Sequence, residues 1–140
     1  MKMLLPIIAT LLAGGIPVAP AAEPVPLARI APAELQARLD KDKELVILDV
    51  RTPVEFAAGH VPGARNVPHD EVAARLPELA ALRDQPVVLY CRSGRRSGLA
   101  AEQLRAAGFT RLLQLEGDYP GWDAQGRPVE REPERAPASN

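Results

Sequence analysis

The 140-residue chain has little net charge, one cysteine, two histidines and no internal repeat. A net charge of −1 gives no whole-molecule attraction to nucleic acid or to an acidic surface, so any positive patch must be local. One cysteine and two scattered histidines supply no set of metal ligands. We therefore expect no metal, no cofactor and no nucleic-acid partner, and the length allows one domain.

The first residues have the pattern of a secretory signal sequence. Lys2 provides the positive start, Leu4 to Ile16 is apolar, and Ala19-Pro20-Ala21 is a small-x-small cleavage pattern. We expect cleavage near Ala21/Ala22, a periplasmic location and no membrane association afterwards. The uncharged run of residues 3–22 is also about long enough for a membrane anchor, which needs roughly 20 residues. Its prolines and glycines, and the lack of a basic segment after it, favour cleavage.

If the protein is exported, the lack of a second cysteine to pair with Cys91 is informative. Cysteines in an oxidising compartment usually pair as disulfides. An unpaired one is buried and inert, joined to another chain, or kept as a reactive thiol. The residues around Cys91 in the sequence are needed to choose among these three possibilities.

Short apolar runs alternate with helical segments over the centre of the chain. Residues 22–26 read as an extended leader, 27–129 as the domain, and 130–140 as a disordered tail rich in proline and charge. The runs predict strands over residues 27–30, 44–50, 64–67, 86–90 and 111–115. The alternation indicates an α/β fold with a mostly parallel sheet.

The segments between these strands carry helix signals. Pro32 and Pro53 suit the first turns of two helices, and residues 70–82 predict two short helices separated at Pro77. A longer helix follows Cys91 and ends near Gly108, where a C-terminal cap belongs. Residues 116–122 predict a short turn or helix.

Asp49 and Cys91 each stand at the carboxyl end of a buried strand. Ligands of open α/β sheets bind beyond these ends, so we expect the two residues to share one site.

The loop "YCRSGRRS" has the chemistry of an activated nucleophile. Gly94 allows a tight turn that directs backbone N–H groups inward, and the following helix start adds partial positive charge. Arg92, Arg95 and Arg96 add full charges. These effects favour the thiolate of Cys91 and would hold a small oxyanion beside it.

At these residues the chain resembles the rhodanese family. "LDVRTPVEFAAGHVPGARNVP" is similar to the first half of the rhodanese module, "YCRSGRRS" looks like its active-site loop, and "LEGDYPGWDAQGRPV" is similar to its closing segment. The resemblance implies a three-layer fold in which a mostly parallel five-stranded sheet is flanked by helices.

The resemblance also implies sulfur transfer. Cys91 would take the outer sulfur of a donor such as thiosulfate as a persulfide and pass it to cyanide, a thiol or a protein acceptor. The backbone N–H groups that hold the bound sulfur would come from the loop, residues Arg92, Ser93, Gly94, Arg95 and Arg96. Supporting positions would be Asp49, Arg51, Glu55 and Ser97, as a charge network and a hydroxyl beneath the loop.

One residue departs from the family pattern, and three others have simple structural interpretations. The closing segment usually begins with two glycines, whereas here Asp118 follows Gly117, and its role is open. We expect His60 to be a hydrogen-bonded turn residue, His69 to lie at the surface, and Trp122 to pack in the core or wall the pocket.

Two other functions compete with sulfur transfer. Tyrosine phosphatases, like arsenate reductases, use a cysteine loop, and the phosphatase loop has C-x5-R spacing. Here Cys91 to Arg96 is C-x4-R, and the shorter loop fits a sulfur atom better than a phosphate. A persulfide carrier or docking module with a protein partner is the second alternative.

Overall fold

The computed structural model describes residues 14–17 and 26–133. Most of the predicted signal sequence, residues 22–25 of the leader, and the tail from residue 134 lie outside these ranges. Within them, no helix has the length and apolar character needed to cross a membrane.

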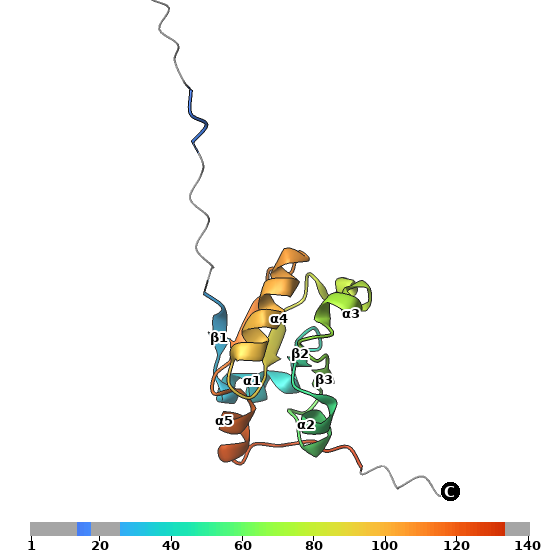
Figure 1. The fold of residues 1–140 in the computed structure, drawn as a ribbon. Helices are drawn as coiled ribbons and strands as arrows, with labels where there is room; N and C mark the ends of the chain where they lie inside the picture. The colour runs from blue at the N-terminus through green and yellow to red at the C-terminus, as the bar shows by residue number, and fades with distance from the viewer. Residues whose placement is uncertain (1–13, 18–25, 134–140) are drawn as a thin grey trace, which may run out of the picture.

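A five-stranded sheet of order β1-β5-β4-β2-β3 forms the centre of the molecule, and all its strand pairs are parallel (Figure 1). The strands are β1 (Ala28–Ile30), β2 (Val46–Asp49), β3 (Arg65–Asn66), β4 (Val87–Tyr90) and β5 (Leu112–Leu115). Every residue of β2 and β4 is buried, which explains why both read as uninterrupted apolar runs in the sequence.

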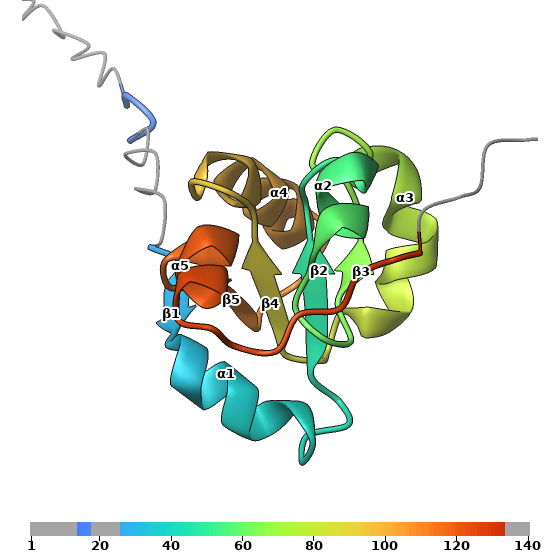
Figure 2. The ribbon, with the colours of Figure 1, turned by 90° about the horizontal axis from the view of Figure 1, so that it is seen from below.

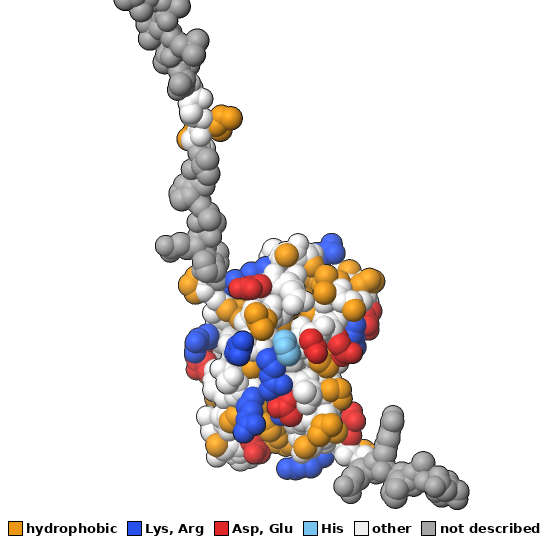
Figure 3. All heavy atoms as spheres, viewed as in Figure 1, with side chains coloured by type: hydrophobic (Ala, Val, Ile, Leu, Met, Phe, Trp, Pro, Cys, Tyr) orange, Lys and Arg blue, Asp and Glu red, His pale blue; other side chains and the backbone are white. Residues whose placement is uncertain are grey.

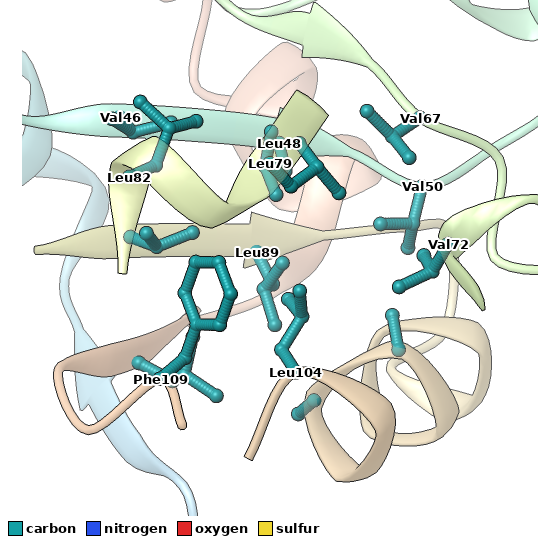
Figure 4. Close-up of a cluster of buried hydrophobic side chains, with 14 of the residues drawn as sticks. Val46, Leu48, Val50, Val67, Val72, Leu79, Leu82, Leu89, Leu104 and Phe109 are labelled. Atoms are coloured by element: carbon teal, nitrogen blue, oxygen red, sulfur yellow. The ribbon is translucent and has the colours of Figure 1, made fainter. Parts of the chain in front are cut away.

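Helices cover both faces of this sheet. One face packs against α3 (Val72–Leu79), the short 3-10 helix η1 (Ala80–Leu82) and α4 (Arg95–Ala106), and Figure 4 shows the side chains that fill this layer. The other face packs against α1 (Pro32–Leu39) and α5 (Asp118–Ala124). Figure 2 shows α1 and α4 on opposite sides of the strands. The predicted three-layer fold is confirmed.

The predicted helix starts at Pro32 and Pro53 and the predicted cap at Gly108 are confirmed, whereas the predicted interruption at Pro77 is not. Gly108 caps α4 with φ at 95°, and the Phe109 N–H donates to the Leu104 carbonyl, as in a Schellman cap. The predicted interruption at Pro77 is wrong, because α3 runs through this residue and the change to a 3-10 turn comes after Leu79. A proline removes one N–H donor, and the burial of Val72 and Leu79 holds the remaining turns in place.

A segment after α5, residues 126–132, crosses back over the domain, and we call it the C-terminal strap (Figure 2). The Trp122 indole N–H donates to the Pro128 carbonyl at 2.8 Å. His60 and Glu130 exchange two backbone hydrogen bonds of 2.9 Å, and the Glu132 N–H donates to Ala57. Hydrogen bonding to the domain therefore continues three residues past Val129, where the sequence placed its end.

Candidate active site

The carboxyl edge of the sheet brings Asp49 and Cys91 together, as the strand ends predict. Asp49 is the last residue of β2 and pairs in register with Tyr90, which immediately precedes Cys91. The arrowheads of β2 and β4 in Figure 2 point toward α2 (Pro53–Ala58) and the loop that leads into α4. The end of β5 adds Asp118 to the same edge.

The Cys91 thiol lies fully buried beneath its own loop. The Gly94 N–H donates to Sγ at 3.0 Å, and the Ser97 hydroxyl lies 3.4 Å from Sγ. Gly94 has φ at 89°, a left-handed conformation that a side chain would strain. The loop therefore directs a backbone donor at the sulfur, as predicted from its glycine.

Asp118 anchors the backbone of Cys91, a role that the sequence did not reveal. Its Oδ1 accepts from the Cys91 N–H at 2.9 Å and from the Gln114 side chain at 2.7 Å. Asp118 has φ at 52°, and the next residue, Tyr119, donates its N–H to the Cys91 carbonyl. The rule that groups Asp49 with Cys91 also applies to the end of β5, so the position of Asp118 could have been found.

Of the loop arginines, Arg96 pairs with the protein itself. Its guanidinium donates to both Glu55 carboxylate oxygens, at 2.8 and 3.0 Å. These bonds, together with those from Thr52, lower the pKa of Glu55 to about 2. Arg92 and Arg95 are exposed and form no ion pair within the described part of the chain, so they are the two loop cations available to an anion.

Asp49 and Arg51 form a second, buried pair at 2.6 Å. Arg51 also donates to the Gly59 carbonyl at 2.7 Å and lies over the Tyr119 ring, 4.1 Å from its centroid. The single charge network expected beneath the loop is thus two hydrogen-bonded pairs, one holding the turn at Gly59 and one holding Arg96.

Two open pockets flank the loop. The arginine-side pocket, of about 320 Å³, is lined by Arg51, Glu55, Ala58, Gly59, Arg92, Tyr119, Pro120, Asp123 and Arg131. The Asp118-side pocket, of about 370 Å³, is lined by Pro26, Leu27, Arg29, Ser93, Gly94, Gly98, Gln114, Leu115, Gly117 and Asp118. Figure 3 shows basic side chains with a few acidic ones on the lower part of the face where Figure 1 places α4, α5 and α2.

The other residues singled out in the sequence have structural positions. His60 is buried, stacks on Phe56 and lies 2.7 Å from the Phe56 carbonyl through Nδ1. Trp122 is fully buried in the core, and His69 is half-buried rather than fully at the surface. Among the described residues, no group of three or more metal-ligating side chains occurs.

Fold and loop together define a cysteine-loop α/β domain, with its thiol at the carboxyl end of a central strand. The chain belongs to the rhodanese-like domain family, whose model matches residues 31–125.

Known relatives carry sulfurtransferase names. The chain is 37% identical over 95 residues to a sulfurtransferase of Allochromatium vinosum, covering 68% of this chain and 87% of the relative. It is 33% identical over 95 residues to the thiosulfate sulfurtransferase GlpE of Pseudoalteromonas translucida, covering 68% and 88%. A solved thiosulfate sulfurtransferase of Pseudomonas aeruginosa superposes with a TM-score of 0.69 at 27% identity, over 76% of this chain and 20% of that one.

Proposed function

We propose that this chain is a thiosulfate sulfurtransferase that carries sulfur as a persulfide on Cys91. The observation that carries the proposal is the Gly94 N–H directed at Sγ at 3.0 Å, in a loop with C-x4-R spacing. A backbone donor there stabilises negative charge on the sulfur. The names of the relatives support the same chemistry.

The reaction has two halves. The Cys91 thiolate attacks the outer sulfur of thiosulfate, the S–S bond of the donor breaks, and sulfite leaves with the electron pair. A nucleophile then attacks the outer sulfur of the persulfide and restores the thiolate. Cyanide would become thiocyanate, and a thiol would become a hydropersulfide.

The exposed cations beside the loop favour a doubly charged donor. Arg92 and Arg95 have no partner in the described ranges, and Arg51 and Arg131 line the pocket next to Arg92. Initial rates with thiosulfate and with mercaptopyruvate, each followed by its own product, test this preference. We expect a higher kcat/KM with thiosulfate, and equal efficiency with both donors would contradict it.

A cysteine phosphatase is the alternative that the loop length disfavours. The C-x4-R loop supplies one residue fewer than a phosphate-binding loop. Hydrolysis of p-nitrophenyl phosphate that disappears in Cys91→Ser would favour the phosphatase.

We also propose that the chain is exported and cleaved near Ala22. N-terminal sequencing of the protein from a periplasmic fraction tests this proposal, and an intact Met1 in the cytoplasmic fraction would contradict it.

A further inference from the structure

The Asp118-side pocket borders the loop that holds Cys91. Two of its lining residues contact Cys91 directly, because Gly94 donates to Sγ and Asp118 accepts from the Cys91 N–H. Its volume of about 370 Å³ leaves room for a small molecule.

One oxygen of Asp118 receives no hydrogen bond from the described residues. The residue is only 8% exposed, and Oδ1 accepts both of the hydrogen bonds described for its side chain. Oδ2 lies beside Gly94 at the pocket wall, 3.5 Å from where a Cβ on Gly94 would stand. Oδ2 is not among the fully buried unpaired atoms of the described residues, so it is open to the pocket and can accept from a ligand donor there.

A cation stands on the same wall. Arg29 of β1 pairs in register with Gln114 of β5, and register partners on neighbouring parallel strands point to the same face. The Gln114 side chain reaches Asp118 on that face. Arg29 is exposed and has no ion pair among the described residues.

Gly98 keeps the α4 side of the pocket open. A Cβ at this position would meet nothing within 4 Å, so a larger side chain would extend into the open space. Glycine inside a helix is less favourable than alanine, and nothing in the packing of α4 requires it here.

We propose that this pocket binds the sulfur acceptor as a small zwitterionic aminothiol of the cysteine type. Its ammonium group would donate to Asp118 Oδ2, and its carboxylate would pair with Arg29. The carboxylate of Asp118 opposes a dianionic donor, which fits the arginine-side pocket better. The inference rests on the proposed sulfur transfer for its chemistry but not for binding itself.

The transfer needs no reactant other than the Cys91 persulfide and the acceptor thiol. The thiol of the acceptor loses its proton, and its sulfur forms a bond with the outer sulfur of the Cys91 persulfide. The bond between that outer sulfur and Sγ breaks, and its electron pair returns Sγ to the thiolate. The proton ends on the product, a hydropersulfide.

Equilibrium binding to the unloaded protein tests the pocket separately from the chemistry. S-methyl-L-cysteine carries both charged groups and no reactive thiol, whereas 2-(methylthio)ethylamine and 3-(methylthio)propionate each carry one. Titration calorimetry should show binding of S-methyl-L-cysteine about tenfold tighter than of either single-charge analogue. Equal affinities for the three compounds would overturn the proposal.

Three variants locate the binding. Asp118→Asn keeps Oδ1 for Cys91 and Gln114 but removes the charge, so the preference for an ammonium should fall about tenfold. Arg29→Gln should remove the preference for a carboxylate, and Arg65→Gln, an exposed arginine on the opposite edge strand β3, is the matched control. Gly98→Ala should raise the melting temperature yet weaken binding of S-methyl-L-cysteine. Unchanged binding in Arg29→Gln and Gly98→Ala would overturn the proposal.

Discharge of the loaded protein completes the test. After loading with thiosulfate, the rate of sulfur loss should saturate at lower concentration with L-cysteine than with N-acetylcysteine or 2-mercaptoethanol. The same half-saturation for all three thiols would overturn the aminothiol assignment. Failure to load at all would instead contradict the proposed function and leave the binding result to decide the pocket.

Discussion

Cys91 is held on both sides of its peptide, with its N–H on Asp118 and its carbonyl on the Tyr119 N–H. The thiol therefore projects from a fixed backbone, and Gly94 supplies the only loop N–H that bonds the sulfur within the described chain. Asp118 takes a left-handed φ of 52°, which aspartate and asparagine tolerate better than most residues. The presence of Asp118 in the closing segment is therefore explained by the backbone conformation that the site requires.

Two substitutions of Asp118 distinguish the hydrogen bonds that Oδ1 accepts from the charge of the carboxylate. Asp118→Ala leaves the buried Cys91 N–H without an acceptor, and we expect a loss of about 1–3 kcal/mol in the free energy of unfolding. Asp118→Asn retains Oδ1 and should lose less than half of that. Urea denaturation of both variants measures the difference, and equal losses would mean that Oδ1 does not anchor the loop.

At the scale of elements, the Glu55–Arg96 pair joins α2 to α4. Glu55 also completes a capping box with Thr52 at the start of α2. The pKa of Glu55 is lowered from 4.5 to about 2, mainly by the hydrogen bond from Arg96. Its ionised form therefore stabilises the folded state above about pH 4.5, and this contribution is lost as the pH falls toward about 2.

Glu55→Gln tests this tie, because glutamine preserves the capping box and removes the charge. At pH 7 the variant should be less stable by about 1 kcal/mol, as expected for a partly exposed pair. The gap to the unmodified protein should narrow steadily below pH 4.5. Unfolding free energies at pH 7, 4 and 3 measure it, and a gap that stays constant would contradict the assignment.

Two glycines near the start of α4 should respond in opposite directions. Gly94→Ala strains a φ of 89° and should cost about 1–2 kcal/mol. Gly98→Ala has ordinary helical geometry and open space, so it should gain about 0.5–1 kcal/mol. Thermal unfolding of the two variants compares them, and stabilisation by both would show that the loop does not need its left-handed turn.

The sequence predicted the helices and strands more completely than the side-chain contacts between them. The runs at β2 and β4 are apolar because both strands are central, and the glycine of "CRSGRR" predicted the turn at the sulfur. The Glu55–Arg96 pair could not be predicted as separate from Asp49–Arg51, because side-chain partners depend on the final approach of α2 to α4. The path of α3 through Pro77 likewise depends on burial of its flanking residues.

At the scale of the whole molecule, the C-terminal strap joins α5 to the turn at His60. A chain ending at Arg127 would lose the acceptor of the buried Trp122 indole and the bonds of Glu130 and Glu132. We expect it to unfold with about 2–4 kcal/mol less free energy. Full stability in the shortened chain would contradict a structural role for the strap.

The backbone pairing of the strap could not be predicted from its composition. Its proline and alternating charge are typical of a disordered tail, yet the backbone of Glu130 pairs with His60. Such pairing comes from a turn 70 positions earlier in the chain, and local composition carries no information about it. The order of motifs along the chain, by contrast, was enough to predict the three layers and the position of Cys91.

The central claim is that Cys91 accepts a single sulfur atom from thiosulfate. Intact-protein mass spectrometry after incubation with thiosulfate should show a gain of about 32 Da that cyanide removes. Cys91→Ser, treated in the same way, should show no gain. An unmodified mass in the native protein, or the same gain in Cys91→Ser, would contradict sulfur transfer through this cysteine.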